Sequence, residues 1–156
     1  HEAFHIARKS SAYCIGIDTH GKLQWGAAEF DGQAQLVITD EECPKAYHDR
    51  LTEQGISWIA VGNNGINLAR AMVLLTEEFG VERLAVTGGG HINGAFLKAG
   101  LLDEVSFMVA PGIDGREWMA AVFDGIADRR RPATQLKLKS IKQMGDTVWL
   151  RYNFKR

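Results

Sequence analysis

Apolar and polar positions follow two alternating patterns along the first two thirds of the chain. Short apolar runs bounded by turn residues are typical of buried strands, whereas apolar residues three and four positions apart line one face of a helix. Strands and helices that alternate in this way predict an α/β protein with three layers, in which a mostly parallel sheet lies between helices. The predicted strands are residues 12–18, 35–39, 56–61, 81–87 and 105–110, and the predicted helices are residues 44–55, 68–79 and 91–99.

The predicted helices carry recognisable end signals. Pro44 stands at a helix start, where its missing N–H is not needed, and Asn67 is suited to cap residues 68–79. That second helix has apolar side chains at positions 68, 71, 72, 75 and 79, which form one stripe and predict a face buried in the core. A glycine, typical of a helix C-terminus, stands at or just after the end of each predicted helix: Gly55, Gly80 and Gly100.

An antiparallel hairpin is predicted at the C-terminus, which makes the expected sheet a mixed one. Residues 135–143 and 147–154 have strand character, and Gly145-Asp146 between them suits a tight turn. Side chains alternate between the two faces of a strand. One face of the second strand is expected to carry Val148, Leu150, Tyr152 and Phe154, and the other Trp149, Arg151 and Asn153.

Three consecutive glycines, Gly88, Gly89 and Gly90, join the predicted strand 81–87 to the predicted helix 91–99. Glycine allows a sharp turn and a close approach of the backbone to a ligand. The N–H groups at the start of a helix and the positive end of its dipole favour an anion such as a phosphate. A tight strand-to-helix turn uses glycine for packing alone as well, and the segment matches neither GxGxxG nor a P-loop.

Composition and charge narrow the range of functions. The chain has 156 residues, 46% of them hydrophobic, and a formal net charge of −1, which predicts a single domain with a substantial core. A nearly neutral chain has no general attraction to nucleic acid or to anionic membranes, and no apolar run approaches the roughly 20 residues of a membrane span. Cys14 and Cys43 are interpreted as thiols rather than a disulfide, and a cytoplasmic location is expected.

The first five residues match the HExxH pattern of zinc hydrolases. On a helix this spacing places His1 and His5 on one face for zinc, with Glu2 as the base. A helix at this position has nothing before it to hold the ligands rigid, and metal sites need such support. A chance match on a surface helix is the alternative, and we expect no metal.

The segment from Val81 to Gly115 contains, in order, the apolar strand pattern, Gly-Gly-Gly, Asn-Gly-x-Phe-Leu, Ala-Gly-Leu-Leu-Asp-Glu-Val and Ala-Pro. This order of motifs resembles the C-terminal reductase domain of riboflavin biosynthesis (the RibD C-terminal domain), which has the dihydrofolate reductase-like fold. The resemblance is dense over residues 81–115 and continues more weakly over residues 12–154. One departure is Thr87, which stands where that family often has an acidic residue.

This resemblance implies an NADPH-dependent reductase that transfers a hydride to C1′ of a ribosylamino-pyrimidine phosphate or a related small heterocycle. It implies a homodimer and often a cis Gly-Gly peptide in the glycine turn. No acid–base residue is singled out, so the catalytic residues are unknown. The expected cofactor-binding residues are Gly88, Gly89, Gly90, His91, Ile92, Asn93 and Gly62, with Thr19, His20 and Lys22 as the turn that receives the 2′-phosphate.

For each of the two basic segments, a solvated turn or loop without a binding role is the alternative interpretation. Residues 19–22 have the composition of an ordinary solvated turn. Arg129, Arg130 and Arg131 suit either a substrate phosphate or a solvated loop. For the whole chain, the alternative to a reductase is a non-catalytic NADP-binding domain.

The resemblance also implies that one interior strand of the sheet is not in this sequence. An interior gap would leave two rows of backbone groups unpaired, each costing about 1–3 kcal/mol. We therefore expect that an N-terminal segment or another chain completes the sheet, or that the sheet is rearranged around Ala85 and Phe107.

Overall fold

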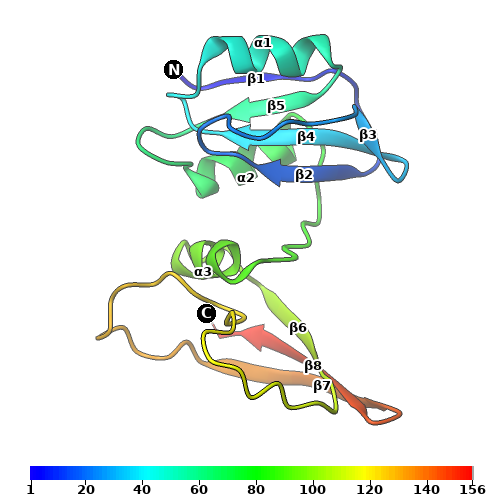
Figure 1. The fold of residues 1–156 in the computed structure, drawn as a ribbon, viewed down its shortest axis with the longest axis vertical. Helices are drawn as coiled ribbons and strands as arrows, with labels where there is room; N and C mark the ends of the chain where they lie inside the picture. Colours follow the sequence, from blue (N-terminus) through cyan, green and yellow to red (C-terminus); the bar gives the residue numbers. More distant parts are fainter. Residues whose placement is uncertain (156) are drawn as a thin grey trace. The chain divides into compact units, whose positions relative to one another are not determined.

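The structure is a computed structural model that describes residues 1–155, arranged in two compact units, one from His1 to Leu84 and one that begins at Ala85. The ribbon in Figure 1 shows the helices and strands of each unit. The first contains β1 (Ala3–His5), β2 (Tyr13–Ile17), β3 (Glu29–Phe30), β4 (Gln33–Thr39), α1 (Lys45–Glu53), β5 (Ser57–Ala60) and α2 (Leu68–Glu77), and the second contains α3 (Gly90–Lys98), β6 (Glu104–Val109), β7 (Leu136–Met144) and β8 (Thr147–Phe154).

The first unit is built on a sheet with the strand order β1-β5-β4-β2, and the short β3 pairs with β4. Strands β2, β4 and β5 are parallel, with Ile17 opposite Ile38 and Ile38 opposite Ile59, whereas β1 and β3 are antiparallel to their neighbours. The carboxyl ends of the three parallel strands therefore lie at the same edge of the sheet. This edge carries the turns that follow Ile17, Thr39 and Ala60.

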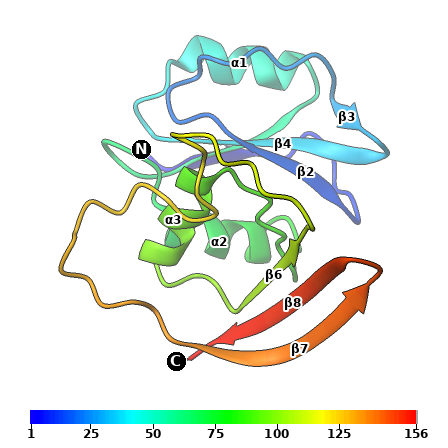
Figure 2. The ribbon, with the colours of Figure 1, turned by 60° about the horizontal axis from the view of Figure 1, so that its bottom comes forward.

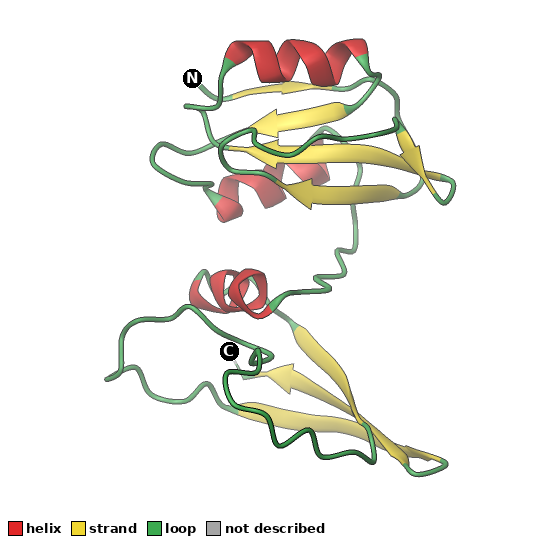
Figure 3. Ribbon diagram, viewed as in Figure 1, coloured by secondary structure: helices red, strands yellow, loops and turns green. Residues whose placement is uncertain are grey.

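Helices cover both faces of this sheet, as the three-layer prediction requires (Figure 3). On one face, Leu36, Ile38 and Ile59 form a buried cluster with residues of α2 and the turn after it, namely Ala71, Leu74, Leu75 and Phe79. On the other face, Val37 packs with residues of and near α1, namely Tyr47, Leu51 and Ile56. Alternate residues of β4 thus point to opposite cores, because successive side chains of a strand face opposite sides.

The predicted helix ends are confirmed. The Asn67 side chain accepts a hydrogen bond from Arg70 N at 3.0 Å and caps α2, and Pro44 precedes the first residue of α1. The apolar stripe of α2 faces the core, with Ala71 and Leu75 buried. Gly55, Gly80 and Gly100 all have positive φ, as helix-terminating glycines commonly do.

A buried hydrogen-bond network holds the end of β2 against α1. Asp18 is 7% exposed, and its carboxylate accepts bonds from the Tyr47 hydroxyl at 2.7 Å, Leu23 N at 2.8 Å and Lys22 N at 3.0 Å. Trp25 Nε1 in turn donates to the Tyr47 hydroxyl oxygen. Burial raises the pKa of Asp18, but these hydrogen bonds outweigh it, so the pKa is lowered and the carboxylate stays ionised.

The second unit contains an antiparallel sheet with the order β6-β8-β7. The predicted hairpin is confirmed, with Met144 opposite Thr147 across a two-residue turn in which Gly145 has a φ of 62°. The two faces of β8 alternate as expected: the Tyr152 ring stacks on Phe107 on one face, and the Trp149 ring lies under the Arg151 guanidinium on the other.

A chain segment between β6 and β7, which we call the strap (residues 121–125), packs against the first turns of α3 (Figure 2). Asp124 N donates to Gly90 O at 2.9 Å, and Asn93 Nδ2 donates to Val122 O at 2.8 Å. A Cβ atom at Gly94 would lie 1.8 Å from Asp124 O, and one at Gly90 would lie 2.3 Å from Ala121 O. Gly90 and Gly94 are therefore required for close backbone packing.

Two secondary-structure predictions are wrong. Residues 81–87 form no strand, because no strand among the described residues pairs with them; Val81 N instead donates to Leu75 O at the end of α2. An apolar run shows that a segment avoids water, but not that a neighbouring strand is available. The N-terminus forms the strand β1 rather than a surface helix, because it pairs with β5.

We predict that Gly94→Ala destabilises the protein, although Gly→Ala inside a helix normally stabilises it by about 1 kcal/mol. The added methyl group would collide with the Asp124 carbonyl oxygen, and such overpacking costs about 1–3 kcal/mol. Urea unfolding measures the change. Ala95→Gly, at an exposed position of the same helix, is the matched control and should lose only about 1 kcal/mol. A more stable Gly94→Ala protein would contradict the packing.

We also predict that Asp18→Asn lowers stability by about 1–3 kcal/mol at neutral pH, because a buried acceptor of several hydrogen bonds loses its charge. A carboxylate with a lowered folded pKa stabilises the protein above its unfolded pKa of about 3.9, and this contribution is lost as the pH falls through the folded pKa. The difference between parent and variant should therefore shrink in acid. The exposed Asp49→Asn serves as the control. If Asp18→Asn lowers the stability as much in acid as at neutral pH, the proposed role of the Asp18 network is contradicted.

Candidate functional site

The edge formed by the carboxyl ends of the parallel strands brings three of the expected site residues together. Asp40 N donates to Thr19 O at 3.2 Å, which ties the turn after β2 to the end of β4. Glu41 N donates to Gly62 O at 2.9 Å, and Gly62 N donates to the Glu41 side chain at 3.2 Å. Residues Thr19, His20 and Gly62 thus lie around the Asp40-Glu41 segment, at the edge where open α/β sheets bind ligands.

Gly62 is required by the loop itself. Its φ is +94°, and a Cβ atom there would lie 2.3 Å from Gly65 O and 2.5 Å from Asn67 N. The turn that leads from β5 to the cap of α2 therefore closes only with glycine at this position. A contact between Gly62 and a cofactor stays a prediction.

The other titratable side chains beneath this edge are structural. Burial raises the pKa of the Cys43 thiol to about 11, with the charges of Asp18 and Asp40 adding to it, so Cys43 is not a thiolate nucleophile at neutral pH. Burial lowers the pKa of His48, whose ring stacks on Trp58 at 4.3 Å between centroids. Both cysteines are free thiols, as the sequence predicted.

The glycine turn in the second unit leads directly into α3. Asn93 N donates to Gly89 O at 3.0 Å, so the N–H groups of the three preceding residues, Gly90 to Ile92, have no acceptor four residues back within the helix. The peptide bond between Gly88 and Gly89 is cis, as the resemblance predicted. Gly88 has a φ of +103°, a conformation that L side chains rarely adopt. Gly89 has a φ of −69°, a value that any residue can adopt.

The space around the turn differs between its glycines. A Cβ atom at Gly89 would meet no protein atom within 4 Å, whereas the Gly90 position is filled by the strap. The side chains of the first helical turn also face the strap: Asn93 donates to it, and His91 Nε2 lies 4.0 Å from Asp124 Oδ2. Open space next to Gly89, free N–H groups and a helix dipole make this an anion-binding geometry.

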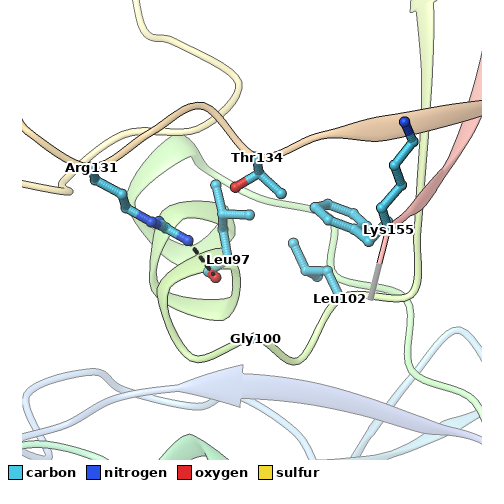
Figure 4. A pocket seen from close by; sticks show the side chains of 7 residues that line it. Leu97, Gly100, Leu102, Arg131, Thr134 and Lys155 are labelled. Atoms are coloured by element: carbon cyan, nitrogen blue, oxygen red, sulfur yellow. Dashed lines mark hydrogen bonds between the residues drawn. The ribbon is translucent and has the colours of Figure 1, made fainter.

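The C-terminal end of α3 borders a cavity of about 220 Å³, in which apolar side chains meet two basic residues (Figure 4). The Arg131 guanidinium donates to Leu97 O at 3.4 Å and so contacts a carbonyl in the last turn of the helix. A cation at this place stabilises the negative end of a helix dipole. The residues that line the cavity are Leu97, Gly100, Leu102, Arg131, Thr134, Phe154 and Lys155.

The zinc hypothesis is wrong. His1 lies just before β1 and His5 at its end, so the helix that HExxH requires is absent, and four residues of extended chain span about 13 Å. Glu2, the supposed base, forms a bidentate pair with Arg70 at 2.7 and 2.8 Å. Among the described residues, no group of three or more potential ligands is arranged to hold a metal ion.

Two buried acidic residues at this edge, Asp18 and Asp40, were not predicted from the sequence. Each follows directly after a parallel strand, and both are buried, Asp40 completely. An acidic residue at the end of an apolar strand was the available signal, but its burial depends on the helix packed above it.

None of the helices among the described residues is long and apolar enough to cross a bilayer.

Comparison with known proteins identifies the architecture. The model of the RibD C-terminal domain family matches residues 15–150. Two solved structures, which show the fold alone, are a pyrimidine reductase-like protein from Corynebacterium diphtheriae (TM-score 0.72, 18% identity, covering 91% of this chain and 60% of that one) and RibD from Acinetobacter baumannii (TM-score 0.68, 19% identity, covering 90% and 37%).

Curated relatives point the same way. The riboflavin biosynthesis protein RibD of Bacillus amyloliquefaciens is 29% identical over 103 residues, which are 65% of this chain and 28% of that protein. The 2,5-diamino-6-ribosylamino-4(3H)-pyrimidinone 5′-phosphate reductase of Methanothermobacter thermautotrophicus is 35% identical over 77 residues, which are 49% of this chain and 36% of that protein. The chain thus spans about a third of the length of these relatives.

The expected fold of a mixed α/β reductase-like domain is confirmed by these neighbours. Because the family model covers most of the sequence, from the first parallel strand to the C-terminal hairpin, the chain belongs to the RibD C-terminal domain family.

Proposed function

We propose that this chain is the reductase domain of a riboflavin-pathway enzyme that uses NADPH to reduce a ribosylamino-pyrimidine phosphate. The family and the reductase named above support the class of reaction and substrate. The observation that carries the proposal is the start of α3, where a glycine turn leaves N–H groups and open space for an anion. The cofactor pyrophosphate suits such a site.

The residues of the turn fit a dinucleotide in three respects. Gly88 adopts a backbone conformation that favours glycine, Gly89 leaves the approach open, and the N–H groups of Gly90, His91 and Ile92 are free of partners within the helix. Asn93 has a different part in this proposal: it fastens the strap to the helix through Val122 O and so supports the turn.

The turn after β2 is proposed to receive the 2′-phosphate that distinguishes NADPH from NADH. His20 and Lys22 are exposed there, and Thr19 offers a hydroxyl. Asp18, the acidic residue of the turn, does not oppose an anion strongly, because its carboxylate already accepts bonds from Tyr47 and two backbone N–H groups. Gly62 closes the neighbouring loop.

The bound nicotinamide would supply the hydride, and the role of the chain is to hold the cofactor and substrate in register and to exclude water. Hydride transfer to C1′ would form a C–H bond as the C1′–O4′ bond breaks, and the released O4′ would take up a proton whose donor in this chain is unassigned. A homodimer and a cytoplasmic location belong to the same proposal, as does completion of the sheet by a further segment.

We predict that Gly89→Val weakens NADPH binding at least about tenfold, equivalent to about 1.4 kcal/mol, while the protein folds normally. The valine side chain meets no protein atom but fills the space proposed for the pyrophosphate, and the φ of −69° is accessible to valine. Titration of NADPH by fluorescence measures the effect. Gly112→Val, at another unobstructed glycine, should bind as the parent does. Unchanged affinity in Gly89→Val would remove the glycine turn from the site.

The reaction itself is tested by NADPH oxidation with the ribosylamino-pyrimidine phosphate and, separately, with dihydrofolate, on this protein. We expect turnover of the first substrate and none of the second. Tight NADPH binding with no turnover of either would favour the non-catalytic NADP-binding alternative.

A further inference from the structure

Asp40 contains a buried oxygen without a hydrogen-bond donor. The residue is 0% exposed, and its Oδ1 accepts a bond from Glu42 N at 3.1 Å. Within residues 1–155, Oδ2 of Asp40 is the buried side-chain oxygen that has no hydrogen-bond partner. Buried polar atoms are almost always paired, because an unpaired one loses water without replacement. This oxygen therefore needs a donor at the edge of the sheet.

The His20 side chain is placed to supply a hydrogen-bond donor to Asp40 Oδ2. Its Nδ1 lies 3.7 Å from Asp40 Oδ2, longer than a hydrogen bond but within ion-pair distance, and the His20 side chain is 60% exposed. The backbones are already fastened together, since Asp40 N donates to Thr19 O at 3.2 Å. A small rotation of the ring would bring Nδ1–H to Asp40 and leave Nε2 for a ligand, because the two ring nitrogens are distinct.

The other charged groups around His20 do not compete for this role. Asp18 is saturated by Tyr47 and backbone donors, and the raised pKa of Cys43 keeps that thiol neutral. The side chain of Glu41 accepts a bond from Gly62 N. Lys22, exposed in the same turn, adds a positive charge on the solvent side.

We propose that Asp40 is a positioning residue that orients His20 through Nδ1, so that His20 Nε2 binds a phosphate monoester more tightly in acid than in base. This inference rests on the proposed function, in which the monoester is the 2′-phosphate of the dinucleotide. When the ring is protonated, Nε2–H donates a charge-assisted bond to the phosphate, and the buried Asp40 carboxylate balances the imidazolium.

The binding test compares 2′,5′-ADP with 5′-AMP by calorimetry at about pH 6 and about pH 8, on the full chain. The parent should prefer 2′,5′-ADP at least about tenfold at the lower pH, as a charge-assisted hydrogen bond provides, and less at the higher pH. His20→Gln, at an exposed position, should fold normally and lose the pH dependence. Glu42→Gln, which removes a neighbouring charge, should keep it.

Two further measurements separate positioning from simple packing. Nitrogen NMR of the ligand-free protein should show neutral His20 with its proton on Nδ1, and Asp40→Asn should abolish this tautomer preference and the pH dependence. If Asp40→Asn does not fold, the parent tautomer and His20→Gln decide the matter. A proton on Nε2, or a preference for 2′,5′-ADP that is absent, independent of pH or unchanged in His20→Gln, would overturn the inference.

These outcomes differ from those that test the proposed function. If the protein transfers hydride equally well from NADPH and NADH and shows no preference for 2′,5′-ADP, the proposed reductase activity is supported and the inference about His20 is overturned. A pH-dependent preference without any turnover would support the inference and count against the reductase.

Discussion

Parallel pairing of β2, β4 and β5 is the constraint on which the first unit depends. Parallel strands need crossover connections, and the one from β4 to β5 carries α1 to one face of the sheet. The helix α2, which follows β5, covers the other face, and each helix buries its own cluster. The same pairing aligns the carboxyl ends of the strands. Turns that are far apart in the sequence, after Ile17, Thr39 and Ala60, therefore become neighbours at one edge.

Burial of acidic groups at this edge shapes the surface above them. Asp18 is saturated with donors and fixes the turn that carries Thr19, His20 and Lys22. Asp40 is completely buried, but its Oδ2 has no hydrogen-bond partner among the described residues and lies 3.7 Å from His20 Nδ1. The two carboxylates thus differ in role because their surroundings supply different numbers of hydrogen-bond donors, not because their side chains differ.

Close backbone packing organises the second unit. The strap approaches α3 so nearly that Gly90 and Gly94 have no room for a side chain, while Gly89, one residue earlier, faces open space. Neighbouring glycines in one motif therefore differ: Gly90 and Gly94 allow the chain to pack on itself, whereas a side chain at Gly89 would meet no protein atom. A mutation in the glycine turn is informative only when these positions are kept apart.

Periodicity in the sequence determined the parts of the fold that local physics controls. The apolar stripe of α2, the Asn67 cap and the Gly145-Asp146 hairpin all depend on residues close together in the chain, and all three are confirmed. The motif order from Val81 to Gly115 also indicated the family, because a glycine turn followed by a helix is visible in the sequence itself.

Tertiary structure alone decided which segments pair with one another. Residues 81–87 have the apolar pattern of a strand, but no strand within residues 1–155 pairs with them. The first residues form β1 because β5 offers an edge. The burial of Asp40, and with it the placement of His20, likewise depends on contacts between distant segments, which no local pattern encodes.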